Sequence, residues 1–206
     1  MTETPSAVKG IRVLTPANWI DLDLDPATSA ASLARLVDEQ VGGGHERAAD
    51  RRQLTEWLRT ATAEARANGS VFASMLSDTI DGVPVSASLF VSLAGDDRPA
   101  TTGQDDADRA RGLAGYLSEP GAPLEGAVVR VAELRAGWAV RARRRTSVRM
   151  AGLDRLVEVE NLQYFVLIPR SPALLVLTFS TPVVSLAEAL VALFDAIAET
   201  LEWETA

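Results

Sequence analysis

An arginine-rich segment is the part of this sequence best suited to recognising a charged partner. Seven Arg and one Glu lie between Arg130 and Arg149, a local net charge of +6, whereas the whole chain of 206 residues carries −8 and its remainder therefore −14. On a β-strand, alternate side chains share a face. The candidate partner-binding residues, which would lie on one such face, are Arg141, Arg143, Arg145 and Arg149. These arginines are suited to binding an acidic partner, since a guanidinium group binds carboxylates and phosphates through paired hydrogen bonds.

The same arginines also fit a purely structural role. A tight turn at Ala151-Gly152 would place three of them opposite acids on the next strand: Arg145 opposite Glu158, Arg143 opposite Glu160 and Arg149 opposite Asp154. Such cross-strand ion pairs on an exposed sheet contribute about 0.2 to 1 kcal/mol each. A solvated ladder of ion pairs and a cationic patch for an acidic partner therefore both remain open. Arg144 lies among apolar residues of the other face, and the pattern assigns it no role.

The residues that most catalytic and metal sites need are missing. The chain has no Cys, which excludes disulfides, thiolate ligands and cysteine nucleophiles. His45 is the only His, and Ala49 stands where the zinc motif H-E-x-x-H needs its second His. No Ser lies in G-x-S-x-G, and the glycine run at 42–44 lacks the Lys of a phosphate-binding loop. We predict no catalytic residue, no metal site and no cofactor.

Two acidic groups have structural explanations. Asp21, Asp23 and Asp25 resemble the start of an EF-hand loop, but Pro26 and Ser32 occupy the positions of its Gly and its bidentate Glu. These acids are better explained as the wet face of an extended segment and, at Asp25, the N-cap of a helix. The second group, at 105–108, opens a predicted helix, where the helix dipole favours negative charge.

Hydrophobic periodicity predicts mainly helices in the first half of the chain. Extended segments at 11–14 and 19–25 precede a helix from Pro26 to about Val41 and a second one over about 46–68. Residues 71–80 and 83–93, joined by Asp81-Gly82, predict a hairpin in which Phe72, Leu76 and Ile80 face Val91, Ala87 and Val83. A third helix is expected over about 105–117. Of the four Trp residues, only Trp19 fits an exposed anchor.

The second half predicts a β-meander followed by a helix. Strands are expected at 127–134, 138–150, 153–168 and 173–180, because their short connections force antiparallel neighbours. A capping box at Ser185 and Glu188 predicts the start of the last helix, with Asp195, Glu199 and Glu202 facing water. Residues 164–168 and 174–176 are apolar at consecutive positions, which requires cover on both faces of the sheet. We therefore expect an α+β fold, a three-layer α/β/α sandwich with a mainly antiparallel sheet.

Composition indicates one soluble domain. Hydrophobic residues make up 47% and charged residues 23% of the chain, near the average of globular proteins. We expect a flexible N-terminus over 1–9 and a single domain over 10–206. The start of the chain has no signal-peptide pattern, and the longest nearly apolar window, 172–179, is far shorter than a membrane span, so a cytoplasmic location is expected. The net charge of −8 argues against nucleic acid and acidic membranes as partners.

Residues 125–206 resemble known proteins. The segments LRAGWAVR, VENLQYFVLIP and LLVLTFSTPVVSLAEALVALFDAIAETLEW are similar to those of an actinobacterial family of uncharacterised proteins. A strand, Thr-Pro and an amphipathic helix ending near Trp203 also resemble the PsbP-like superfamily. The resemblance implies an antiparallel sheet between helices and a role in docking onto other proteins, and it implies no catalytic residue.

These observations favour a non-enzymatic accessory or adaptor protein. It would bind a protein partner, with the arginine face as the candidate surface, and a homo-oligomer is compatible with the sequence. The alternative is a protein or enzyme that binds a small anion or metabolite in a pocket between the sheet and the first two helices. Such a pocket would use His45 or the acidic face at 21–25.

Overall fold

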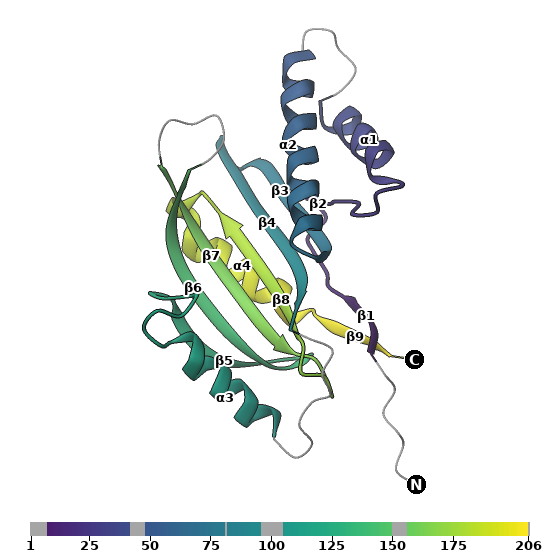
Figure 1. Ribbon diagram of the computed structural model, residues 1–206. Coiled ribbons are helices and arrows are strands. Elements are labelled where there is room, and N and C mark those ends of the chain that lie inside the picture. The colour runs from purple at the N-terminus through teal and green to yellow at the C-terminus, as the bar shows by residue number, and fades with distance from the viewer. Residues whose placement is uncertain (1–7, 42–47, 81, 96–104, 150–155, 206) are drawn as a thin grey trace.

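The computed structural model describes residues 8–41, 48–80, 82–95, 105–149 and 156–205 (Figure 1). The helices are α1 (Ser29–Val41), α2 (Ala48–Ala67), α3 (Asp106–Leu117) and α4 (Ala187–Glu199), with a short 3-10 helix, η2 (Val184–Leu186), before α4. The strands are β1 (Val8–Arg12), β2 (Trp19–Asp21), β3 (Ser70–Ile80), β4 (Val83–Ala94), β5 (Val128–Leu134), β6 (Gly137–Arg149), β7 (Leu156–Leu167), β8 (Leu174–Thr181) and β9 (Glu202–Thr205).

Within these residues the main sheet has the strand order β2-β3-β4-β8-β7-β6-β5, and each neighbouring pair is antiparallel. Helix α4 lies against one face, whereas α1, α2 and α3 lie on the other (Figure 1). The predicted three-layer α/β/α sandwich with an antiparallel sheet is therefore confirmed. None of the helices in the described ranges is long and apolar enough to cross a membrane.

The main core lies between the sheet and α4. Phe194 of α4 is fully buried and stacks on Phe179 of β8, with ring centroids 5.0 Å apart. The same ring meets Trp19 of β2 edge to face at 6.3 Å. Trp19 is only 7% exposed, so the sequence-based expectation of an exposed anchor there is wrong. Its indole lies beneath α4 because β2 extends the sheet under that helix.

The hairpin of β3 and β4 matches its predicted register. Phe72 pairs with Val91, Leu76 with Ala87 and Ile80 with Val83. Gly82 has a φ of +80°, as the predicted turn requires of a residue without a side chain. Residue 81 lies outside the described residues.

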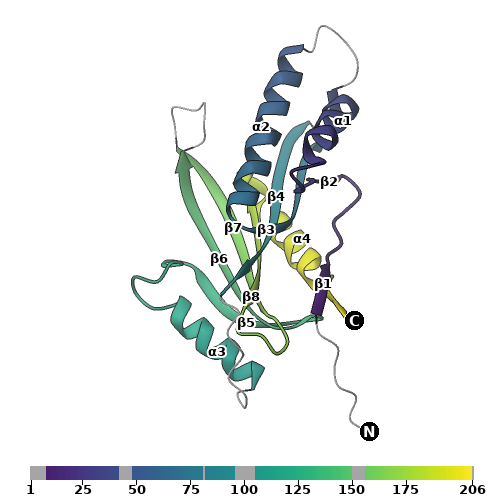
Figure 2. The same ribbon diagram turned by 45° about the vertical axis from the view of Figure 1, so that its right-hand side comes forward.

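The beginning and end of the chain pair with each other. Strand β1 runs antiparallel to β9, with Ile11 opposite Trp203 (Figure 2). Trp203 Nε1 also donates a hydrogen bond to the carbonyl oxygen of Ala136 at 2.7 Å. The strand expected at 11–14 thus lies slightly earlier, and it includes Val8 and Lys9 of the expected N-terminal segment. Strand β9 was not predicted, since four residues after a helix carry little periodicity.

The predicted capping box at the start of α4 is wrong. Ser185 lies in η2, and no side chain caps the first turn of α4. Glu188 instead forms an ion pair with Arg143 of β6. A tertiary contact with an arginine therefore replaces the local hydrogen bond that the Ser-x-x-Glu spacing predicts.

Candidate functional site

The two faces of the central strands β4, β8 and β7 differ in chemistry. Toward α4, a row across these strands is apolar and fully buried: Leu89, Phe179 and Leu162. On the opposite face the neighbouring row consists of Ser88, Ser180 and Asn161, all partly exposed. The strands therefore place hydroxyl and amide groups on the face of the sheet that is opposite to α4.

We call this region the polar floor, which comprises Ser88, Thr146, Asn161, Gln163, Thr178 and Ser180. Ser180 Oγ donates to Asn161 Oδ1 at 2.9 Å, and Asn161 Nδ2 donates to Thr146 Oγ1 at 3.0 Å. Gln163 Nε2 donates to Thr178 Oγ1 at 3.2 Å. The two Thr hydroxyls accept in these bonds, and each retains an O–H donor for a further partner.

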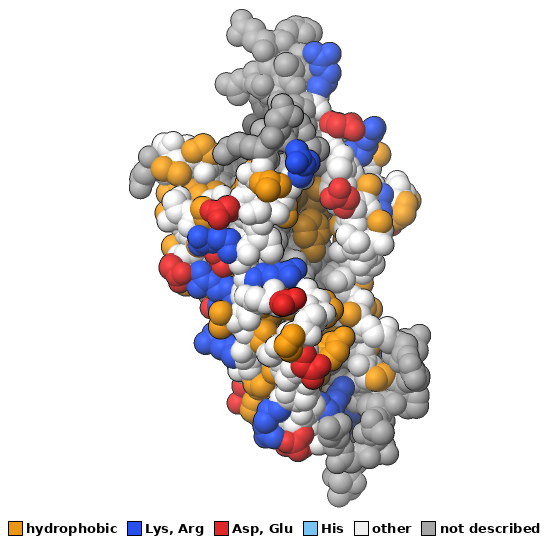
Figure 3. All heavy atoms as spheres, turned by 60° about the vertical axis from the view of Figure 1, so that its left-hand side comes forward, with side chains coloured by type: hydrophobic (Ala, Val, Ile, Leu, Met, Phe, Trp, Pro, Cys, Tyr) orange, Lys and Arg blue, Asp and Glu red, His pale blue; other side chains and the backbone are white. Residues whose placement is uncertain are grey.

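The helices on this side leave the polar floor between them. Helices α1 and α2 lie side by side and pack on Ala73 and Met75 of β3 (Figure 2). Helix α3 packs on β5 and β6 and covers Leu167 and Leu174 at the far ends of β7 and β8. Figure 1 looks onto the strands between these helices. Figure 3 shows a hollow on this side of the molecule, with hydrophobic side chains inside it and charged side chains around it.

Arg144 lies at the margin of the polar floor toward α3. It is in register with Asn161, and the row continues through Ser180 and Ser88. Its Nη1 donates to the carbonyl oxygen of Pro123 at 3.1 Å. Its Nε atom is buried without a hydrogen-bond partner in the described part of the chain. This arginine, to which the sequence assigned no role, therefore has capacity for an acceptor.

Arg141, a sequence-predicted candidate, is buried on the opposite face. Its Nε and Nη2 donate to the two carboxylate oxygens of Asp195 in α4 at 2.8 and 3.0 Å. Tyr164 also donates its hydroxyl to Asp195 Oδ1 at 2.6 Å. Burial opposes the charge on Arg141, but the bonds to Asp195 outweigh it and raise its pKa, while burial and the bond to Asp195 raise the pKa of Tyr164. The expectation that Asp195 faces water is wrong, because this carboxylate ties α4 to the sheet.

Arg143 and Arg145 share a buried acid. Arg143 Nε donates to Glu160 Oε1 at 2.9 Å, and Arg145 Nε and Nη2 donate to Glu160 Oε2 at 3.1 Å. Arg143 also holds Glu188 through two bonds of 2.6 and 3.1 Å, and these bonds lower the pKa of the Glu188 carboxyl. Together with the Arg141–Asp195 pair, three arginines meet three carboxylates. The network is electrically neutral, and it is buried at Arg141 and Glu160 but exposed at Glu188.

The predicted register between β6 and β7 is wrong by two residues. Arg145 lies opposite Glu160 rather than Glu158, and Arg149 lies opposite Leu156. The described parts of the two strands end at Arg149 and begin at Leu156, and the expected turn at Ala151-Gly152 and Asp154 lie outside the described residues. A shift of two keeps every side chain on its predicted face, so the arginines still share one face. Arg149, the fourth candidate, is exposed.

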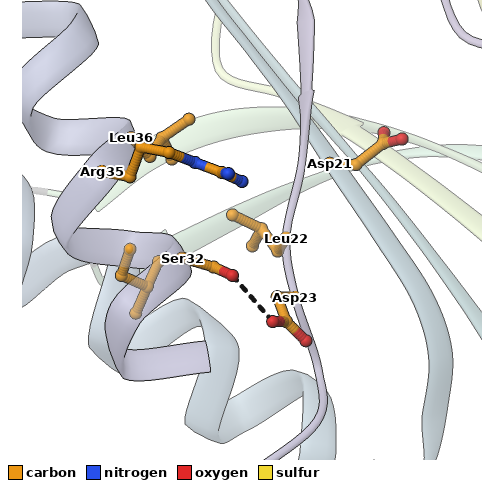
Figure 4. A pocket seen from close by; sticks show the side chains of 7 residues that line it. Asp21, Leu22, Asp23, Ser32, Arg35 and Leu36 are labelled. Carbon is orange, nitrogen blue, oxygen red and sulfur yellow. Dashed lines mark hydrogen bonds between the residues drawn. The ribbon is translucent and has the colours of Figure 1, made fainter. Parts of the chain in front are cut away.

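A pocket of about 120 Å³ lies where the alternative hypothesis expects one, beside the acidic segment and α1 (Figure 4). Its lining includes Asp21, Asp23, Ser32 and Arg35. Asp23 is engaged structurally, since it accepts hydrogen bonds from Ser32 Oγ at 2.8 Å and from the Asp25 amide at 2.9 Å. Hydrogen bonds from Thr28, the Asp25 amide and Ser32 lower its pKa. The pocket is thus built around the turn that starts α1.

The remaining candidates of that hypothesis do not form a catalytic centre in the described residues. His45 and the glycine run lie outside them. The Asp25 carboxylate accepts from the Ala27 amide at 2.8 Å in the turn before α1, and that helix begins at Ser29 rather than at the predicted Pro26. Among the residues that the structure describes, no group of three or more His, Cys, Asp or Glu side chains could hold a metal ion.

Sequence reasoning missed the polar floor, although a signal for it exists. In β4, Ser86, Ser88 and Ser92 alternate with buried Val85, Ala87, Leu89 and Val91. Asn161 and Gln163 in β7 alternate with apolar residues in the same way. Period-two polar positions on neighbouring strands predict a shared polar face once the strand order is known, but β4 and β8 are far apart in sequence.

Comparison with known proteins shows only a distant structural likeness. No protein-family model matches the chain, and no curated protein matches it. Among solved structures, the chain is similar to LpqN, described as involved in cell envelope biogenesis of Mycobacterium tuberculosis. The sequences are 14% identical, the match covers 99% of this chain and 87% of that one, and the TM-score is 0.44.

Proposed function

We propose that this chain is a non-enzymatic accessory protein of the cytoplasm that binds a protein partner on the polar floor. The observation that most directly supports this proposal is a sheet face with hydrogen-bonding side chains, which the helices of the described residues leave uncovered. Fully buried sheet faces are apolar, and exposed ones need polar groups. A concave, uncharged and partly exposed floor flanked by helices can seat one further element of a partner.

The proposal moves the docking surface away from the arginine face. Arg141 has only 8% of its side chain exposed, and its charge is matched by Asp195. Arg143 and Arg145 are matched by Glu160 and Glu188. An acidic partner would have to displace these bonds before it could bind there, whereas the polar floor requires no such exchange.

A docking role also agrees with the resemblance to the PsbP-like superfamily and to actinobacterial proteins, which remains part of this proposal. The proposal excludes nucleic acid and membrane lipid as the main partners, because the net charge of −8 repels polyanions. Retardation of nucleic acid in a gel at low salt would contradict that exclusion.

Position-specific photo-cross-linking in the native cell tests the proposal. A photoreactive amino acid replaces Gln163 on the polar floor or, as the control, Ala192 on the exposed side of α4. We expect a discrete protein adduct from position 163 and none of that size from position 192, recovered in the cytosolic fraction. Adducts of equal yield from both positions, or none from position 163, would contradict the proposed site. An adduct with a second copy of the chain would identify the site as a homo-oligomer interface instead.

A further inference from the structure

We infer that Arg144 is the anchor of this site and that it binds a carboxylate group on an acidic peptide segment laid across the polar floor. The inference rests on the proposed function, since it names the chemistry of the partner at the same surface.

The first support is the position of Arg144. It ends a row of hydrogen-bonding side chains that crosses four strands through Asn161, Ser180 and Ser88. The hydrogen bond from its Nη1 to the Pro123 carbonyl oxygen holds the guanidinium at the margin of the floor. A peptide lying along this row would meet hydroxyl and amide groups first and the guanidinium at the end.

The second support is charge. Arg141, Arg143 and Arg145 of the same strand each have a carboxylate partner, whereas no acidic side chain of the described residues bonds to Arg144. Glu158 and Glu160 of β7 cannot pair with Arg144, because they lie on the other face of the sheet. The polar floor itself is uncharged, so Arg144 gives this surface a local positive charge within an acidic chain.

The third support is the unsatisfied Nε atom. It is buried without a hydrogen-bond partner in the part of the chain that the structure describes. A buried donor left unpaired costs about 1–3 kcal/mol, and an incoming acceptor can remove that cost. A carboxylate fits best, because its two oxygens match the fork of a guanidinium. A single unmatched cation suits one carboxylate on a peptide better than the repeated phosphates of a nucleic acid.

Selection from a phage-displayed library of random dodecapeptides tests this inference. The targets are the wild-type chain, Arg144→Gln, Arg144→Glu and, as a matched control for charge removal, Arg130→Gln on the opposite face. We expect peptides with a recurrent Asp or Glu from the wild type and from Arg130→Gln, loss of that acid with Arg144→Gln, and Lys or Arg in its place with Arg144→Glu.

A double-mutant cycle then measures the contact. Replacing the recurrent acid of a selected peptide by its amide should weaken binding to the wild type about 10-fold to 100-fold, as for a hydrogen bond between charged groups. The same replacement should have little effect on binding to Arg144→Gln, since the two changes remove one interaction. Equal weakening in both proteins would overturn the role of Arg144.

Blocking variants separate the inference from the proposed function. Ser180→Arg and Ser88→Lys fill the polar floor, and thermal unfolding verifies that each still folds. If they abolish binding of the selected peptides while Arg144→Gln does not, the polar floor is the binding site but Arg144 is not its anchor. If neither affects binding, the proposed site is wrong as well. Failure of the wild type to enrich any peptide would contradict the inference of a peptide partner.

Discussion

Asp195 holds two buried groups at once, the guanidinium of Arg141 and the hydroxyl of Tyr164. We expect Asp195→Ala to lower the free energy of unfolding by about 3 kcal/mol, because it leaves a buried charge without its partner. Urea unfolding followed by Trp fluorescence measures this loss. Glu188→Ala serves as the control, since its carboxylate is 85% exposed and should contribute little. Equal losses in the two variants would show that burial does not set the strength of these pairs.

The lowered pKa of Asp23 predicts that the stability of the folded chain depends on pH. Hydrogen bonds from Thr28, the Asp25 amide and Ser32 lower its pKa in the folded chain, so the folded protein binds this proton less strongly than the unfolded one. The stability that Asp23 contributes is therefore present above its unfolded pKa of about 3.9 and is lost as the pH falls through its lower folded value. We expect Asp23→Asn to flatten the decline of the unfolding free energy that begins as the pH falls below the unfolded pKa. An unchanged decline would contradict this assignment.

The hydrogen bonds of Thr181, rather than a cap at Ser185, should stabilise the segment that leads into α4. It is fully buried, donates to the Ser86 carbonyl at 2.8 Å and accepts from the Val183 amide at 3.1 Å. Thr181→Val should destabilise the chain by about 1–3 kcal/mol, because it leaves buried polar groups unpaired. Ser185→Ala should change stability by less than about 0.5 kcal/mol, since Ser185 is exposed and caps nothing. A larger loss from Ser185→Ala in thermal or urea unfolding would restore the capping-box interpretation.

Elements were predicted well where their signals are local. The hairpin of β3 and β4 has the expected register because Asp81-Gly82 sets both strands from one point. The register of β6 and β7 was missed because no comparable turn sequence specifies where those strands begin. Strand β9 was missed for another reason: its partner β1 lies at the opposite end of the sequence.

At the scale of the whole molecule, Phe194 joins α4 to both halves of the sheet. It contacts Phe179 of β8 and Trp19 of β2, two elements distant in sequence. We expect Phe194→Ala to lower the unfolding free energy by about 3–5 kcal/mol, as a cavity at a fully buried ring does. Phe90→Ala, at a partly exposed ring on the other face, is the control and should cost less. Calorimetry that ranks the two variants the other way would mean that the core does not centre on α4.

The candidate site was likewise predictable only where it depends on local patterns. Alternation alone placed Arg141, Arg143, Arg145 and Arg149 on one face, and the structure keeps them there, because side-chain alternation is a local property of any strand. Their carboxylate partners Asp195 and Glu188 come from α4, roughly 40 to 55 residues further along the chain, and no local pattern specifies which helix covers a strand. Three of the four arginines that the sequence suggested as a cationic patch are therefore neutralised by carboxylates, and Arg141 is buried.

The amino-acid sequence by itself determined the types of the longer elements, the antiparallel meander and the need for helices on both faces, since each follows from periodicity and short connections. Only the tertiary structure decided which face each helix covers, which arginines are neutralised and where polar side chains remain uncovered. Those outcomes depend on contacts between segments far apart in the chain, such as β4 beside β8 and α4 above β6, and the free energy of such contacts is set by packing rather than by neighbouring residues.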